Sequence, residues 1–301
     1  GVPLTVLSIT EEHEIAIVEM GANHIGEIAD LCEICQPDYG IITNIGKAHL
    51  EGFGSYEGVK TAKSELYRFI EKAGGTVFVN SSDSLLMELA SNIKKVGYGE
   101  KKEDYCQAKA LSLAPKIEAQ WETTRESGEI HSNLFGEYNY HNLLCAVCVA
   151  AYFEVPAKEI DLSLSSFHPQ NNRSQLIQTK KNKIVLDAYN ANPSSMEVAI
   201  STCHRNFGRN VVFILGDMFE LGKESAEEHK RIVDLLKEQG TQNAILIGKE
   251  FCKVDRSDRY HIFEDRTSAE EFLKQNPPNE KVILIKGSRG MQLEKLLPFI
   301  P

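Results

Sequence analysis

Short apolar runs rich in Val, Ile and Phe alternate with amphipathic helical runs along most of the chain, and this alternation constrains the fold more than any other feature. Strands that are nearly continuous in such residues must be covered on both faces. The alternation is therefore typical of βαβ units and a parallel sheet. In the first half it predicts strands at 13–21, 39–45 and 76–80, and helices at 25–36, 55–70 and 84–92.

Residues 104–135 have a different pattern of short alternating runs and turns, which predicts a small antiparallel insert before a long apolar helix at 139–153. The stretch FHPQNNRS (167–174) then interrupts the pattern with Pro and polar residues. We therefore predict two α/β domains, 1–167 and 168–301. The second is expected to be an open, Rossmann-like domain. Its predicted strands are 183–189, 210–217, 243–248, 260–263 and 281–288, and its helices lie near 194–207, 225–239, 267–275 and 291–299.

The charge balance narrows the classes of partner. The 301 residues carry a formal net charge of −10, which argues against a broad surface for nucleic acid or anionic membrane. There is no run of about 18 apolar residues that would span a membrane. The chain opens on Gly1 and apolar residues without Met, so we read it as a piece of a longer protein.

Seven cysteines, an odd number spread thinly, suit reduced thiols in a cytoplasmic protein better than a disulfide framework. Two CxxC pairs, Cys32/Cys35 and Cys145/Cys148, raise the alternative of a zinc site. Both pairs lie in helical patterns in which i and i+3 share an apolar face. Buried small side chains are therefore the favoured interpretation.

Polar residues follow the expected strands of the first half. Glu19 ends the first strand and His49 lies just beyond the second, so both fall at the carboxyl edge of one parallel sheet, where ligands bind. A carboxylate and an imidazole there could hold a divalent metal, although Mg²⁺ prefers oxygen ligands. The alternative is a helix-capping glutamate and a packed loop histidine. Lys63 would matter only if it pointed to the same edge.

The second half has three polar strand ends. Asp187 precedes a turn with Asn190 and Asn192, where Ser194 or Ser195 could cap the next helix; Asp217 and Glu220 follow another strand. Lys286 and Arg289 lie in a Gly-Ser loop and would suit a carboxylate or phosphate. Loops need Gly, Asn and Asp in any case. Neither GxxxxGK[ST] nor a strand-to-helix GxGxxG is present, so the chain contains no complete phosphate cradle.

Several stretches, in this order, resemble the Mur ligases: GVPLTVL, EMGANHIGEI, TNIGKAHLEGFGSYEGVKTAKSE, GEYNYHNLLCA, DAYNANPSSM, GDMFELG and KGSRGMQLE. YNANP, GDMxELG and KGSR favour the member that joins D-Ala-D-Ala to UDP-N-acetylmuramoyl-tripeptide. The resemblance implies a central ATPase domain lacking its P-loop front end, followed by the C-terminal Rossmann-like ligase domain. It also implies that this piece is inactive alone.

The resemblance assigns site residues as well. Glu19, His49 and Lys63 match the magnesium ligands, with Lys63 carbamylated, and Lys63, His49 and Asp187 match the catalytic set. The residues that match the nucleotide site are Asn139, Asn142, Arg173, Asp187, Tyr189, Asn190 and Asn192. The residues that match the dipeptide site are Asn190, Lys286, Ser288 and Arg289. Many relatives have His where Tyr138 stands.

The implied reaction is ATP-dependent amide formation through an acyl phosphate, with Mg²⁺, in peptidoglycan precursor synthesis. The implied protein is a cytoplasmic monomer whose partners are UDP-N-acetylmuramoyl-tripeptide and D-Ala-D-Ala. Two alternatives stay open: a sister amino-acid ligase, such as another Mur enzyme or a folylpolyglutamate synthase, and a non-catalytic α/β binding module.

Overall fold

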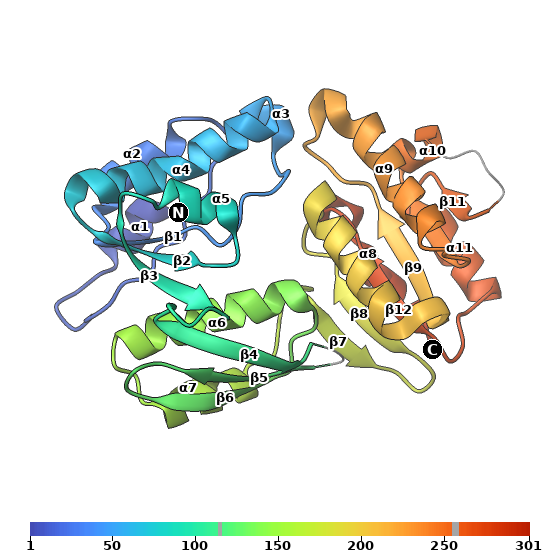
Figure 1. The fold of residues 1–301 in the computed structure, drawn as a ribbon. Coiled ribbons are helices and arrows are strands. Elements are labelled where there is room, and N and C mark those ends of the chain that lie inside the picture. The colour runs from blue at the N-terminus through green and yellow to red at the C-terminus, as the bar shows by residue number, and fades with distance from the viewer. Residues whose placement is uncertain (114–115, 255–258) are drawn as a thin grey trace. The chain divides into compact units, whose positions relative to one another are not determined.

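The structure, a computed structural model, describes residues 1–113, 116–254 and 259–301. Figure 1 shows two α/β parts with a six-stranded sheet in each. Contacts group the chain into two compact units, of which the first comprises 1–109, 121–127 and 144–156 and the second comprises 110–120, 128–143 and 157–301. The division passes through the expected insert and the long helix that follows it, and the boundary at 167/168 stays a prediction.

The first sheet has the order β1-β2-β3-β4-β5-β6, and β1 to β4 pair in parallel. Its strands are β1 (Tyr39–Ile41), β2 (Thr76–Asn80), β3 (Lys94–Gly99), β4 (Cys106–Ser112), β5 (Ile117–Glu122) and β6 (Ser127–Ser132). The helices of this half are α1 (Val2–Leu7), α2 (Glu27–Cys35), α3 (Leu50–Phe53), α4 (Tyr56–Ala73), α5 (Ser84–Leu89), α6 (Glu137–Tyr152) and α7 (Ala157–Ser166). The mostly parallel sheet and the short strands expected in 104–135 are confirmed; β3, α1, α3 and α7 had not been predicted.

The strand expected at 13–21 is wrong, because this segment contains neither strand nor helix. A strand needs a hydrogen-bonded neighbour, and β1 is the terminal strand of the sheet on this side. Ile15 is 52% exposed and Ile17 is 86% exposed, so the apolar pattern that predicted a covered strand is left uncovered. Composition alone does not show whether a partner strand is present.

Helix α4 begins after the predicted start at Ser55 but extends to Ala73, beyond the predicted end at residue 70. The hydroxyl of Ser55 accepts a hydrogen bond from the Gly58 N–H and caps the first turn, and Gly74 ends the helix in a left-handed conformation. Tyr67 and Ile70 on its inner face pack with buried residues of β2 and α5 in one cluster. Lys63 lies one turn before Tyr67 on the same face of α4 and is half-buried.

The second sheet has the order β11-β10-β9-β12-β8-β7, and all its pairs are parallel except β7 with β8. Its strands are β7 (Gln175–Gln178), β8 (Lys183–Asp187), β9 (Val211–Gly216), β10 (Ala244–Ile247), β11 (His261–Phe263) and β12 (Val282–Lys286). The α-helices are α8 (Pro193–Phe207), α9 (Ser225–Glu238), α10 (Lys249–Val254) and α11 (Arg266–Gln275). The 3₁₀ turns are η1 (Gly208–Asn210), η2 (Gly222–Glu224), η3 (Arg289–Met291) and η4 (Leu293–Phe299).

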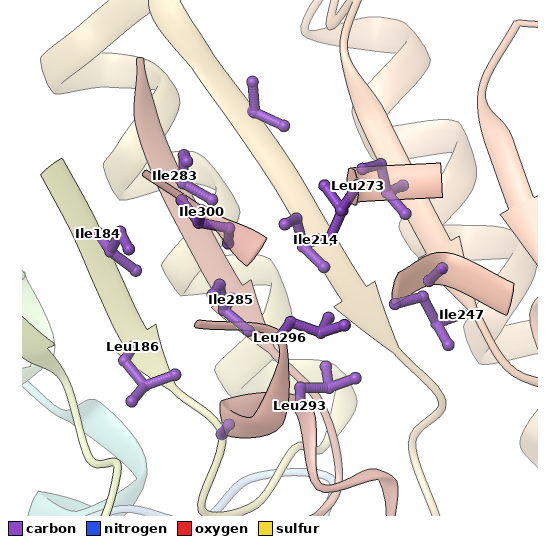
Figure 2. Close-up of a cluster of buried hydrophobic side chains, with 14 residues drawn as sticks. Ile184, Leu186, Ile214, Ile247, Leu273, Ile283, Ile285, Leu293, Leu296 and Ile300 are labelled. Atoms are coloured by element: carbon purple, nitrogen blue, oxygen red, sulfur yellow. The ribbon is translucent and has the colours of Figure 1, made fainter. Parts of the chain in front are cut away.

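Side chains at alternate positions of these strands build the core in Figure 2. Ile184 and Leu186 of β8 and Ile283 and Ile285 of β12 point to the same face as Ile214 of β9, as a period of two requires. α11 and η4 supply Ala269, Leu273, Leu293 and Leu296 from the other side of this core. The central strands β9, β10 and β12 are buried along their whole length, and their sequences are apolar up to the polar residues at their ends.

Two details of the second half differ from the predictions. The helix expected at 291–299 consists of 3₁₀ turns, since Pro298 lies inside it and cannot donate to an α-helical ladder. The short strand β7 and helix α10 were not predicted. Within the described residues, no helix is both long and apolar enough to cross a membrane.

Candidate functional site

The carboxyl ends of β8, β12 and β9 are neighbours in the second sheet, and polar loops follow all three. The chain passes from β8 through α8 to β9, and β12 later fills the place between them. Such a reversal of strand order is a topological switch point, and open α/β sheets bind ligands in the crevice outside it. The three polar strand ends of the sequence therefore form one edge.

Asp187 and Lys286 form a buried ion pair at this edge. The Lys286 Nζ donates to Asp187 Oδ2 at 2.5 Å and to the Asn190 backbone carbonyl at 3.2 Å. The side chain of Lys286 is 3% exposed and that of Asp187 is 14% exposed. The other carboxylate oxygen of Asp187 accepts the Ser174 N–H at 3.0 Å. Lys286 thus has its counter-charge, Asp187, within the protein.

Tyr189 is flanked by two arginines. The guanidinium carbon of Arg173 lies 3.7 Å from the centre of the Tyr189 ring, and that of Arg289 lies 5.1 Å from it. A hydrogen bond and the positive charge of Arg173 lower the pKa of the Tyr189 hydroxyl, and Arg289 adds to the effect. Both arginines are exposed. The arrangement places two cations where they can bind an anionic group.

Ser288 joins the three loops rather than facing solvent. It is buried, its hydroxyl accepts the Phe219 N–H at 2.8 Å, and it donates to the Ala191 carbonyl at 3.5 Å. Its own N–H donates to the Asp217 carbonyl at 3.1 Å. The predicted substrate-binding residue Ser288 is therefore placed to hold loop geometry.

Asn192, and neither Ser194 nor Ser195, caps helix α8. Its side chain accepts the Ser195 N–H at 2.9 Å, and the Ser195 hydroxyl accepts the Asn192 N–H at 3.2 Å, a reciprocal capping box with Pro193 at the first helical position. Asn190 is exposed, and its side-chain oxygen accepts the Ala191 N–H at 2.9 Å. Of the two asparagines, Asn190 is the one left at the surface of the site.

The residues expected to meet the nucleotide base lie at the start of α6. Asn139 is buried, and its amide donates to the Phe135 carbonyl at 2.7 Å, whereas Asn142 is exposed. The neighbouring Tyr138 makes a short hydrogen bond from its hydroxyl to the Ser174 hydroxyl. Burial raises the pKa of Tyr138. The start of α6 is thereby tied to the segment that holds Asp187.

In the first unit, Lys63 points from α4 to the segment that follows β1. Its Nζ donates to the Asn44 carbonyl at 2.8 Å. Burial lowers the pKa of the Lys63 amine. The Lys63 amine is therefore directed at the segment that follows β1 and leads to His49. Its approach to Glu19, which was the condition set from the sequence, stays a prediction.

Glu19 and His49 lie in the same unit as Lys63. Glu19 is exposed in the irregular segment before α2, and His49 is half-buried with φ 54° at the start of α3. Among the residues that the structure describes, no three His, Cys, Asp or Glu side chains gather into a group that could hold a metal ion. A carboxylate made from Lys63 would be a further oxygen donor, and the metal site stays a prediction.

Glu65 is a residue of this region that sequence reasoning missed. It is 6% exposed, and its carboxylate accepts the N–H groups of Gly26 and Ala29 at 2.7 and 3.0 Å. It therefore fixes the start of α2 against α4, two residues after Lys63. The available signal was a glutamate on the apolar face of an otherwise amphipathic helix.

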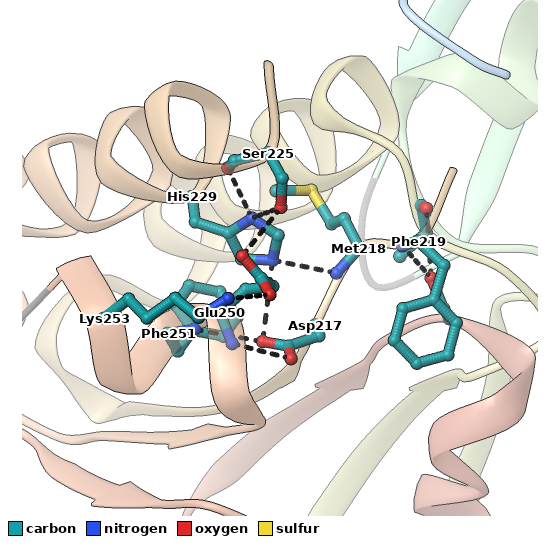
Figure 3. Close-up of polar contacts among 10 residues, drawn as sticks. Asp217, Met218, Phe219, Ser225, His229, Glu250, Phe251 and Lys253 are labelled. Atoms are coloured by element: carbon teal, nitrogen blue, oxygen red, sulfur yellow. Dashed lines mark hydrogen bonds and ion pairs between the residues drawn. The ribbon is translucent and has the colours of Figure 1, made fainter. Parts of the chain in front are cut away.

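Asp217 has a structural role. Figure 3 shows it against the start of α10, where it accepts the N–H groups of Glu250 and Phe251 at 3.0 and 3.1 Å. The fully buried His229 of α9 lies beside it, with Nε2 3.6 Å from the carboxylate. His229 accepts the Met218 N–H at Nε2 and donates from Nδ1 to the Ser225 carbonyl at 2.7 Å, the pattern of a neutral ring.

We expect His229 to make stability depend on pH. Burial lowers the pKa of His229 in the folded protein. Below about pH 6.5 the unfolded chain therefore binds a proton at this histidine that the folded chain does not bind, so the free energy of unfolding decreases as the pH falls. The slope is at most about 1.4 kcal/mol of unfolding free energy per pH unit. Urea titrations at several pH values measure this slope. The slope should be smaller in His229→Gln and unchanged in His131→Gln, because His131 is exposed. Equal slopes in all three proteins would contradict the assignment.

Both CxxC pairs lie on helices as predicted, Cys32/Cys35 on α2 and Cys145/Cys148 on α6. All seven cysteines are free thiols. Burial raises the pKa of the Cys32 thiol to about 11, which keeps it protonated and suits a packed side chain.

Fold and site together define an α/β protein with a polar, partly cationic site at the switch point of its second sheet. The family described as "Mur ligase middle domain" matches residues 1–150, and "Mur ligase, glutamate ligase domain" matches residues 172–289. The chain belongs to the Mur ligase family.

The similarity extends over nearly the whole chain. It is 30% identical over 307 residues to the UDP-N-acetylmuramoyl-tripeptide–D-alanyl-D-alanine ligase of Bacillus subtilis (strain 168), covering 99% of this chain and 66% of that protein. The crystal structure of MurF from Acinetobacter baumannii is 31% identical, with a TM-score of 0.85, and the match covers 99% of this chain and 67% of that one. MurF from Thermotoga maritima in complex with ADP is 24% identical with a TM-score of 0.84, covering 99% and 70%, and shows the shared fold. The chain spans about two thirds of the length of these relatives.

Proposed function

We propose that this chain supplies the central and C-terminal parts of an ATP-dependent ligase that joins D-Ala-D-Ala to UDP-N-acetylmuramoyl-tripeptide in peptidoglycan precursor synthesis. The observation that carries the proposal is the 30% identity over 99% of the chain to a protein of that name. The switch-point edge, with Asp187, Arg173 and Arg289, agrees with a reaction between anionic substrates.

The chemistry requires a substrate carboxylate oxygen to attack the γ-phosphorus of ATP. The bond from that phosphorus to the β–γ bridging oxygen breaks, ADP leaves, and an acyl phosphate is formed. The dipeptide amine then attacks the acyl carbon, the C–O bond to phosphate breaks, and the amine loses a proton. Repulsion between carboxylate and triphosphate opposes the first step. We assign Arg173 and Arg289 to bind anionic groups and Asp187 to face the nucleotide, with Asn139, Asn142, Tyr189, Asn190 and Asn192 as the remaining predicted nucleotide contacts.

We also propose that Glu19, His49 and a carbamylated Lys63 hold Mg²⁺, which would offset the charge of the phosphates when bound. The lowered pKa of Lys63 suits this modification, because only a neutral amine adds CO₂. The carbamate would keep one N–H, enough for the bond to the Asn44 carbonyl. A carbamylated lysine supplies the oxygen ligands that Mg²⁺ prefers, whereas an ammonium repels it.

The seven free thiols agree with a cytoplasmic location, and we propose a monomer, which analytical ultracentrifugation would test.

The test of function is phosphate release by the full-length protein that carries this sequence. Release should require ATP, UDP-N-acetylmuramoyl-tripeptide and D-Ala-D-Ala together, and ¹⁸O from the tripeptide carboxylate should appear in the phosphate. Equal turnover with single amino acids in place of the dipeptide would favour a sister ligase and contradict the proposal.

A further inference from the structure

Lys286 is placed to act through Asp187 rather than on a substrate. It is the last residue of β12, one strand away from Asp187 at the end of β8, and the two are direct partners in the parallel register. Its Nζ lies 2.5 Å from Asp187 Oδ2 and 3.2 Å from the Asn190 carbonyl. Both acceptors belong to the β8 loop, so one ammonium group holds the carboxylate and the backbone three residues later.

Burial decides between the two roles open to Lys286. Its side chain is 3% exposed, and a charge that is so deeply buried is retained only with a partner. Asp187 and the Asn190 carbonyl use two of the three N–H donors of Lys286, and at 3% exposure a substrate carboxylate has little access to the third. The exposed Arg289, three residues later, is open to an anionic group without breaking such a pair.

A second donor completes the orientation of Asp187. The Ser174 N–H reaches Asp187 Oδ1 at 3.0 Å, so each carboxylate oxygen has a donor from a different element. Ser174 has φ 48°, a left-handed conformation that is costly for a non-glycine residue, and the preceding Asn172 has φ 59°. The Asn172 carbonyl accepts the Tyr189 N–H at 3.2 Å. The segment before β7 is therefore bound to the β8 loop at two points.

We infer that Lys286 is a positioning residue that holds the Asp187 carboxylate in a fixed orientation, and that it is not a dipeptide contact. The inference rests on the proposed function for the meaning of that orientation. With a donor on each oxygen, Asp187 presents its remaining lone pairs in a fixed direction. If the reaction needs this carboxylate in one orientation in the transition state, removing the residue that orients it lowers the reaction rate. Binding of the substrate in the ground state can stay unchanged.

Kinetics separate a positioning residue from a substrate contact. In the full-length protein, Lys286→Met should lower kcat on the order of 100-fold while the KM for D-Ala-D-Ala stays within about 3-fold of the wild type. Lys295→Met, which changes an exposed lysine bonded to Gln292, should change neither value by more than about 2-fold. A raised KM with kcat retained would show a substrate contact and overturn the inference.

A readout that does not depend on ligation is available in the 301-residue chain. With ¹⁵N-labelled lysine, the buried ammonium of Lys286 should give an NMR signal protected from exchange with water at neutral pH. The signal should disappear in Lys286→Met, lose its protection in Asp187→Asn, and stay in Lys295→Met. Absence of a protected signal in the wild type, or its survival in Asp187→Asn, would overturn the ion pair whatever the protein's activity proves to be.

Discussion

Replacing Lys63 by alanine should lower ligation of D-Ala-D-Ala on the order of 1,000-fold or more in the full-length protein. The amine lies against the Asn44 carbonyl, and burial lowers its pKa, so the neutral form that can be carbamylated is favoured relative to a surface lysine. Alanine removes the carboxylate that the proposal places beside Mg²⁺. The loss should appear in kcat, because charge on the phosphates must be neutralised most in the transition state.

Two further variants show whether the charge or the carbamate matters. Lys63→Arg keeps a cation and a hydrogen-bond donor but cannot be carbamylated, so it should be as inactive as alanine. Lys60→Ala, one turn earlier on α4, should keep activity within about 2-fold. Near-normal turnover by Lys63→Ala would count against the assignment of the whole Glu19, His49 and Lys63 site. Activity in Lys63→Arg would contradict carbamylation alone.

The fold was predictable where local signals and burial agree. β2 was predicted to the residue, because TVFVN is apolar on both faces and fully buried in the structure. The segment 13–21 also contains a run of apolar residues but is mostly exposed and irregular. The difference lies in whether neighbouring chain covers the segment, and that is a tertiary property. In 291–299 the cause is local instead, because Pro298 lies inside the segment and the helical pattern gives way to 3₁₀ turns.

The site was predictable as a set of strand ends but not as a set of contacts. The topology rule brought Asp187 and Lys286 to one edge, and the structure bears that out. The sequence could not show that Asp187 and Lys286 pair with each other, because the two residues are 99 positions apart in the chain. Ser174 carried no signal either, since its contact to Asp187 comes from the backbone in a left-handed conformation.

Gly248→Ala should destabilise the second unit by about 4 kcal/mol, the sum of backbone strain and overpacking. Gly248 has φ 133°, where residues with a Cβ are strained, and an added Cβ would lie 2.1 Å from the carboxyl carbon of Asp217. Asp217 cannot move aside cheaply, because it accepts the N–H groups of Glu250 and Phe251 and lies beside buried His229. Gly248 itself donates to the Phe263 carbonyl at 2.8 Å, which fixes the turn.

Gly240→Ala is the matched control, because Gly240 also has a positive φ of 68° but its added Cβ would meet nothing within 4 Å. It should cost only about 1 kcal/mol, the backbone penalty alone. Urea unfolding followed by circular dichroism measures both variants, and the fluorescence of Trp121, the single tryptophan, reports on the first unit in the same samples. If the two glycine variants lost equal stability, contact with Asp217 would not be the cause. A larger loss in Gly248→Ala that is partly restored by Asp217→Ala would identify the carboxylate as the obstacle, because the smaller side chain leaves room for the new methyl group.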